Sequence, residues 1–194
     1  MKRRIWLTAI GLLLATACGS SIISADGALN PTLAAPQVSS GTFATTEPAG
    51  RFLKQGAAAP DFTLKTLDGR TLSLSDYAGR PVFINFWAAW CGPCRAEMPE
   101  IIAAYQAHQD AGLEVLAVNA THLDILDDVR AFVAEFKMPF PVPLDEDGSV
   151  SAAYSIIGLP TSVFVDAEGN VSGVNVGPMT RDVIEKYLAD ILPK

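Results

Sequence analysis

The pair Cys91 and Cys94, separated by a glycine and a proline, has the spacing in this chain that most directly predicts chemistry. It follows Pro81–Trp87, an apolar run typical of a strand buried on both faces, and stands where a helix is expected to begin. The free N–H groups and the dipole of a helix N-terminus favour a thiolate, the form of cysteine that attacks disulfides. Cys94 is expected one turn further on, turned inward and within reach of the Cys91 sulfur. The spacing therefore predicts thiol–disulfide exchange in which Cys91 attacks first.

Three other interpretations of the cysteine pair are open: half of a zinc site, a static structural disulfide, or two buried thiols without chemistry. A zinc site would need two more ligands, and the chain offers only His108, His122 and the distant Cys18. A static disulfide across two residues would be unusual at a corner between a strand and a helix. We therefore predict a redox-active pair and no metal.

The N-terminus has the pattern of a secretory signal over residues 1–17. Three basic residues at 2–4 precede the apolar run Ile5–Ala17, which is shorter than the roughly 20 residues that span a bilayer. The sequence Ala15–Cys18 resembles a bacterial lipoprotein processing site, at which Cys18 would carry the lipid. Simple cleavage, giving a soluble secreted or periplasmic protein, is the alternative. An odd count of 3 cysteines favours the lipid anchor, because acylation gives the unpaired one a use.

Export and charge together limit the partners. Outside the reducing cytosol, the cysteine pair must either be kept reduced by a donor or be oxidised at rest. The chain carries a net charge of −7, and the expected signal segment contains three of its 14 basic residues. The remaining acidic chain is a poor match for nucleic acid, which calls for a basic patch.

The segment between the signal and the folded domain is expected to be a tether. Residues 18–50 are rich in Ser, Ala, Thr, Gly and Pro, a composition that buries too little apolar area to fold. The domain is expected over 51–194, where strands and helices alternate in the pattern of a mixed sheet between helices. In chain order we expect strands at 62–64 and 71–74 joined by the turn Asp68-Gly69, a strand at 81–87, a helix at 91–109, a strand at 113–119, a helix at 124–137, strands at 162–166 and 171–176, and a helix at 180–192.

Three segments carry a family resemblance. Asn85–Pro99 (NFWAAWCGPCRAEMP) resembles the active-site region of the membrane-anchored TlpA/ResA-type thioredoxins of the AhpC/TSA-redoxin superfamily. Gly158–Thr161 resembles their cis-proline loop, and Ala59–Phe62 resembles their first strand. The match runs in order over residues 56–192. It implies an α/β thioredoxin-like fold, with a mixed central sheet flanked by helices and an N-terminal β-hairpin.

The resemblance also implies a division of roles. Cys91 would attack the client disulfide, Cys94 would resolve the mixed disulfide, and Glu97 would take the proton from Cys94. The alternative for Glu97 is an ordinary solvated helix residue. Asn85 stands where cytosolic thioredoxins usually have a buried aspartate. The residues expected to contact the substrate are Trp90, Gly92, Pro93, Leu159 and Pro160.

The expected function is that of a protein-disulfide reductase tethered outside the cytoplasm, with no cofactor beyond its own disulfide. Its electrons would have to come from a thiol donor in the membrane, because the chain contains no nucleotide or flavin motif. By family analogy, apocytochrome c would be among its clients. One alternative, a thiol peroxidase of the peroxiredoxin branch, lacks its Pro-x-x-x-Thr-x-x-Cys pattern before Cys91. The other is a non-enzymatic copper-binding module, which would need a further ligand such as Met98 or Met179.

Overall fold

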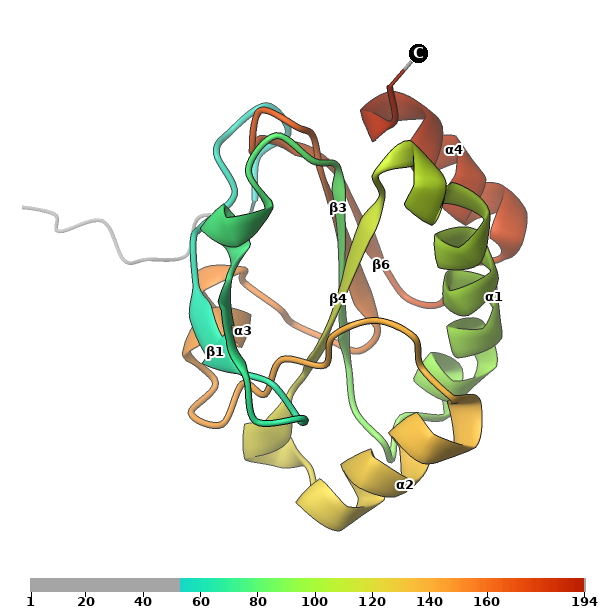
Figure 1. Cartoon of the computed structure of the whole chain (residues 1–194). Helices are drawn as coiled ribbons and strands as arrows, with labels where there is room; N and C mark the ends of the chain where they lie inside the picture. The colour runs from blue at the N-terminus through green and yellow to red at the C-terminus, as the bar shows by residue number, and fades with distance from the viewer. Residues whose placement is uncertain (1–52, 194) are drawn as a thin grey trace, which may run out of the picture. The chain divides into compact units, whose positions relative to one another are not determined.

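The computed structural model describes residues 53–193. The expected signal peptide (1–17), the tether (18–50) and the lipid-anchor candidate Cys18 lie outside the described residues. The central sheet has the strand order β4 (Glu114–Asn119), β3 (Val82–Trp87), β5 (Thr161–Val165) and β6 (Val171–Val176). β3 pairs with β4 in parallel and with β5 antiparallel, and β5 pairs antiparallel with β6. This is the mixed sheet that the sequence predicts (Figure 1).

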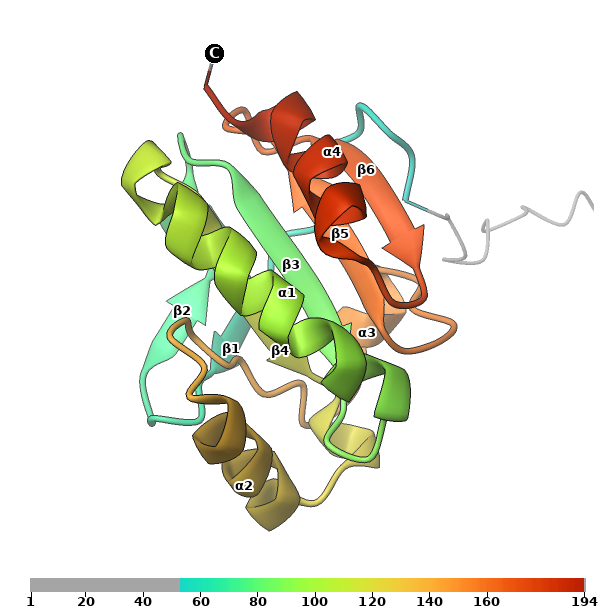
Figure 2. The same ribbon diagram turned by 90° about the vertical axis from the view of Figure 1, so that its right-hand side faces the viewer.

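β3 is one of the two interior strands of the sheet and is buried along its whole length. Because successive side chains of a strand alternate between faces, Phe83, Asn85 and Trp87 share one face. That face is covered by α1 (Gly92–His108), α2 (Leu126–Phe136) and α4 (Arg181–Ile191), and Figure 2 shows α1 and α4 side by side in front of the strands. The apolar residues of β3 thus form the core, and the single polar residue, Asn85, is carried into the same layer.

The opposite face of the sheet is covered by the N-terminal hairpin and a short helix. The hairpin consists of β1 (Thr63–Lys65) and β2 (Thr71–Ser73), paired antiparallel, and is followed by a 3-10 turn at Leu74–Tyr77. Gly69 has a φ of 86°, a conformation that glycine adopts without steric cost, so the Asp-Gly turn signal is confirmed. The short helix is α3 (Ser149–Ala153).

Apart from shifts of one residue at the ends of elements, two helices differ from the sequence prediction. α3 was not expected, because five residues with no charge pattern give no helical periodicity. α2 begins at Leu126 rather than at 124, since Thr121–Leu123 form a 3-10 turn and Asp124 takes an extended conformation. Within residues 53–193, no helix is both long and apolar enough to cross a bilayer.

Candidate active site

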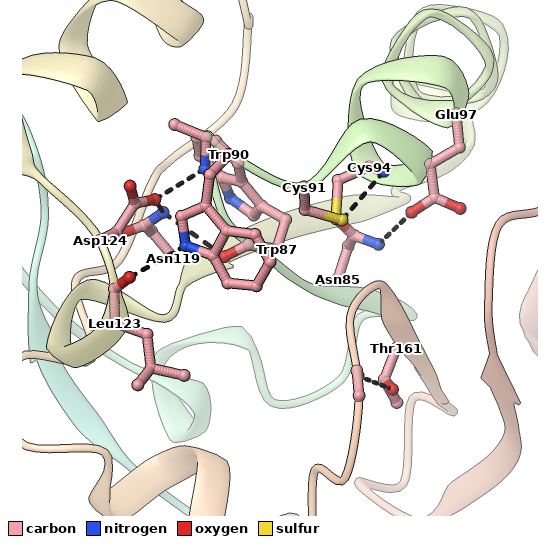
Figure 3. The surroundings of a disulfide bond; sticks show 12 residues. Asn85, Trp87, Trp90, Cys91, Cys94, Glu97, Asn119, Leu123, Asp124 and Thr161 are labelled. Carbon is pink, nitrogen blue, oxygen red and sulfur yellow. Dashed lines mark hydrogen bonds between the residues drawn. A yellow bond between two sulfur atoms is a disulfide. The ribbon is translucent and has the colours of Figure 1, made fainter.

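The cysteine pair follows the end of β3 and lies at the start of α1. Cys91 is the N-cap residue of α1, with extended backbone angles, and its Sγ accepts a hydrogen bond from the Cys94 backbone N–H at 3.2 Å. Pro93 lies in the first turn, where no N–H partner is needed. Cys91 and Cys94 form a disulfide, with their Cα atoms 5.2 Å apart (Figure 3). The predicted placement at a helix N-terminus is therefore confirmed.

The solvent-exposed surface around the disulfide is formed by neighbouring residues rather than by the two sulfur atoms. Cys91 is 3% exposed and Cys94 is fully buried, whereas Gly92 and Pro93 are exposed and Trp90 is 62% exposed. The inner position predicted for Cys94 is confirmed. A client must come into close contact with this surface to reach the Cys91 sulfur.

The loop before Cys91 is held by the loop that follows β4. Trp90 Nε1 donates to the carbonyl oxygen of Leu123 at 2.9 Å, and the Ala89 N–H donates to Asp124 Oδ2 at 2.7 Å. The same Asp124 oxygen accepts a hydrogen bond from Asn119 Nδ2 at 2.9 Å (Figure 3). Sequence reasoning missed Asp124; an acidic residue at the start of the helix predicted over 124–137 was the available signal.

Glu97 lies on α1 one turn after Cys94 and is only 1% exposed. Its Oε1 accepts a hydrogen bond from Asn85 Nδ2 at 2.8 Å, and its Oε2 accepts one from the Met179 backbone N–H at 2.9 Å. Burial raises the pKa of Glu97 from 4.5 to about 7, against the smaller lowering effect of these two hydrogen bonds. The interpretation of Glu97 as a solvated helix residue is therefore wrong.

Asn85 connects Glu97 to the neighbouring strand. Its Nδ2 also donates to Ser162 Oγ on β5 at 3.0 Å, and both residues are fully buried. Its Oδ1 is the one buried side-chain oxygen or nitrogen among the described residues without a hydrogen-bond partner. The sequence signal was a single polar residue within an apolar strand.

The proline loop lies at the same end of the sheet as the cysteines. Thr161 pairs with Phe86, so Pro160 stands opposite the end of β3. The Leu159–Pro160 peptide bond is cis, as predicted. Thr161 Oγ1 closes the loop by donating to the Gly158 carbonyl oxygen at 2.7 Å. Leu159 and Pro160 are thus at the site, while their contact with substrate stays a prediction.

The two histidines are engaged elsewhere in the fold. His108 pairs with Glu185 at 2.8 Å, and His122 Nδ1 lies 3.1 Å from the Asp145 carbonyl oxygen. Between residues 53 and 193, no three His, Cys, Asp or Glu side chains gather in a group that could hold a metal ion.

The sheet is mixed, a disulfide across two residues lies at a helix N-terminus, and a cis-proline stands at the same end of the sheet. Together these features define a thioredoxin-like thiol–disulfide oxidoreductase. Residues 55–174 match the AhpC/TSA family, and the chain belongs to that family as a ResA/TlpA-type redoxin. The fold and the family resemblance expected from the sequence are thereby confirmed.

Individual relatives agree with this class. The thiol-disulfide oxidoreductase ResA of Geobacillus thermodenitrificans is 40% identical over 138 residues, which cover 71% of this chain and 78% of the relative. ResA of Bacillus thuringiensis subsp. konkukian is 38% identical over 138 residues, covering 71% and 79%. Among solved structures, a thioredoxin-family thiol:disulfide interchange protein from Chlorobium tepidum matches with a TM-score of 0.65 at 28% identity, covering 74% of this chain and 100% of that one. StoA from Bacillus subtilis matches with a TM-score of 0.59 at 29% identity, covering 68% and 98%.

Proposed function

We propose that this protein reduces disulfides of client proteins outside the cytoplasm, with Cys91 as the attacking and Cys94 as the resolving cysteine. The observation that carries the proposal is the position of Cys91 as the N-cap of α1, with its sulfur accepting the Cys94 N–H. In the reduced protein, this N–H and the helix dipole favour the Cys91 thiolate. The two cysteines are close enough to form a disulfide, which is the product of the reaction.

The exchange proceeds in two steps. The Cys91 thiolate attacks one sulfur of the client disulfide, forming a mixed disulfide and releasing the other client sulfur as a thiolate. The Cys94 thiol then loses its proton, and its thiolate attacks the Cys91 sulfur. The Cys91–Cys94 disulfide forms, the second client sulfur leaves as a thiolate, and two electrons have passed from the protein to the client.

Glu97 is the proposed acceptor for the Cys94 proton. It stands three residues after Cys94 on the same helix, and residues at this spacing are neighbours on a helix surface. A pKa of about 7 lets Glu97 both take up and return a proton near neutral pH. The proton can therefore be passed on to the leaving thiolate or to solvent, which restores the carboxylate.

Client binding is proposed for the surface around the disulfide. An extended client segment would pair with the backbone beside the cis-proline, as an added strand does. The residues proposed to contact it are Trp90, Gly92, Pro93, Leu159 and Pro160.

We also propose where the protein is located and which partners it has, which involves residues outside those that the structure describes. A cleaved signal over 1–17, lipidation of Cys18 and a tether over 18–50 would hold the domain 51–194 at the outer side of a membrane. A thiol donor in the membrane would supply electrons, and apocytochrome c is a proposed client. No cofactor is required beyond the disulfide. If the lipid anchors the protein, the parent should be found in the membrane fraction and a Cys18→Ser variant should leave it; if simple cleavage gives a soluble protein, parent and variant should both be soluble.

Trapping in cells tests the proposed roles of the cysteines. A full-length Cys94→Ala variant cannot resolve mixed disulfides and should accumulate clients attached through Cys91, released by reductant on a gel. The matched Cys91→Ala variant and the double variant should capture none. If Cys91→Ala captures clients and Cys94→Ala does not, the roles are reversed. If neither does, the proposed reductase function is wrong.

A further inference from the structure

Asn85 Oδ1 is buried without a hydrogen-bond donor in the disulfide form of the protein. Such a group is costly, because it has lost water and gained no partner. The rest of the carboxamide is fully used, since Nδ2 donates to both Glu97 and Ser162. The unpaired oxygen is therefore not a sign of a loosely held side chain. It calls for a donor that is absent in this redox state.

The position of Asn85 makes Cys94 the candidate for that donor. Cys94 and Glu97 are three residues apart on α1, both are buried, and both face the sheet to which Asn85 belongs. In the view of Figure 3 the Asn85 side chain rises from β3 toward the disulfide, with its nitrogen turned to Glu97. Nδ2 and Oδ1 lie on opposite sides of a planar group, so the oxygen is turned away from Glu97. A disulfide has no hydrogen to donate, whereas a Cys94 thiol does.

We propose that Asn85 is a positioning residue that bridges Cys94 and Glu97 during the resolving step. This inference rests on the proposed function. Reduction of the disulfide by two electrons and two protons gives two thiols, at Cys91 and Cys94. Cys91 releases its proton to solvent and becomes the attacking thiolate, whereas the Cys94 thiol donates to Asn85 Oδ1. Asn85 Nδ2 donates in turn to the Glu97 carboxylate. One side chain thus holds the Cys94 thiol, the proton donor, and the Glu97 carboxylate, the proton acceptor, in a fixed position relative to each other.

The same carboxamide also fits the state after proton transfer. One proton moves from the Cys94 sulfur to a Glu97 oxygen, leaving a thiolate that needs a donor and a carboxylic acid that needs an acceptor. A half-turn of the carboxamide meets both needs, because Nδ2 then faces the thiolate and Oδ1 faces the acid. Ser162 fits either orientation, since a hydroxyl both donates and accepts. The composition of Asn85 itself is unchanged throughout.

The groups that contact the Glu97 carboxyl are uncharged, so none of them titrates together with it. Asn85 reaches it from β3, Ser162 on β5 acts only through Asn85, and the Met179 backbone N–H reaches it from the segment before α4. Among the described residues, no charged side chain forms a hydrogen bond or ion pair with Glu97. The titratable partners of the bridge are therefore Glu97 and the cysteine pair.

A stoichiometric reaction with one equivalent of 5,5′-dithiobis(2-nitrobenzoate) separates the two chemical steps. The full chain carries Cys18→Ser, so that Cys91 and Cys94 are its only thiols. The first thionitrobenzoate released reports attack by Cys91, and the second reports resolution by Cys94. Asn85→Leu should slow the second release about 10-fold or more near pH 7, the effect of one lost hydrogen bond to a charged group, and leave the first unchanged. Ser162→Ala, the matched control, keeps the bridge and should slow the second release much less.

The combination with Glu97→Gln tests whether the two residues act together. A bridge predicts that the double variant resolves no more slowly than the slower single variant, whereas independent effects would multiply. The inflection near pH 7 in the rate of the second release should also disappear in both single variants. Multiplying effects, or an Asn85→Leu variant that resolves at the parent rate, would overturn the bridge. A parent protein that releases no thionitrobenzoate would instead overturn the proposed function.

A measurement on the unaltered side chains covers the case in which Asn85→Leu does not fold. The side-chain ¹⁵N–¹H signals of Asn85 should shift when the disulfide is reduced. In the reduced protein they should then titrate with the midpoint of the carboxyl carbon signal of Glu97. Signals that stay constant through that titration would show that the carboxamide has no part in proton transfer.

Discussion

Among residues 53–193, two carboxyl groups are buried, and they are held in different ways. Glu97 is 1% exposed and receives two hydrogen bonds, from a side chain on β3 and from the backbone before α4. Asp145 is fully buried and receives three, from the Val150 N–H at 3.2 Å, the Ser151 N–H at 2.8 Å and the Ser151 hydroxyl at 2.6 Å. Asp145 thus takes all three hydrogen bonds from the helix turn that follows it, with His122 Nδ1 4.0 Å from its Oδ2, whereas both hydrogen bonds to Glu97 come from other elements. The first arrangement builds local structure, and the second leaves a carboxyl group beside the disulfide able to change its protonation state.

Removal of the structural carboxylate should give the largest effect. Asp145→Ala leaves the N–H groups of Val150 and Ser151 buried without an acceptor. We expect a loss of about 4 kcal/mol in the free energy of unfolding, about 2 kcal/mol for each group, measured by urea denaturation. The matched control Asp147→Ala removes an exposed carboxylate that accepts the Ser149 N–H, and should cost much less. Equal losses would contradict the structural role of Asp145.

The buried charge of Glu97 should make stability depend on pH. Its pKa of about 7 in the folded protein exceeds the ordinary value of 4.5, so the folded state holds the proton more tightly. Stability should therefore fall as pH rises from 4.5 to 7, with the whole penalty present above 7. The shift corresponds to about 3 kcal/mol. Denaturation of the oxidised protein at pH 4.5 and pH 8 should show this fall, and Glu97→Gln should remove it. An equal fall in the variant would assign the effect to other groups.

Glu97→Gln should also slow the resolving step, by about 100-fold at pH 8, the usual contribution of a proton acceptor. In the parent protein the rate of that step should rise with pH and be half-maximal near pH 7. The variant should lose this inflection. Stopped-flow release of the second thionitrobenzoate measures both quantities. Glu100→Gln, a second glutamate on α1, is the control and should resemble the parent; an unchanged rate in Glu97→Gln would exclude the carboxylate as base.

The smallest effect is expected from one donor of Asp145. Ser151→Ala removes the hydroxyl that donates to Asp145 Oδ2 and keeps the backbone N–H that donates to the same oxygen. A loss of about 1 kcal/mol in unfolding free energy should follow, the usual value of one hydrogen bond. Thiol–disulfide exchange should be unaffected. A loss as large as that of Asp145→Ala would mean that the hydroxyl alone holds the turn.

The sequence predicted those features of the fold that depend on residues close together in the chain. The apolar run of β3, the start of α1 at the cysteines and the Asp-Gly turn follow from local composition, and the structure has all three. The cis peptide before Pro160 followed from family resemblance alone. The sequence did not predict α3, because this helix is held by hydrogen bonds to the Asp145 carboxylate and has no helical periodicity of its own.

Contacts between distant residues were outside the reach of sequence reasoning. Glu97 was a candidate, but its bond to the Met179 backbone joins residues 82 positions apart, and no pattern in either segment signals it. The Asn85–Ser162 contact spans 77 positions and depends on the pairing of β3 with β5. Polar residues within apolar strands were visible in the sequence, but their partners were not.

Trp90 presents an indole whose one polar atom is already occupied, because Nε1 donates to the Leu123 carbonyl oxygen. Trp90 is 62% exposed, and its indole ring therefore has only carbon atoms left to offer a partner. A polypeptide bound at the proposed client surface would gain from Trp90 by covering this flat area, and not by matching a donor or acceptor. Such a contact discriminates weakly between sequences, which suits an enzyme whose substrates need share only a disulfide.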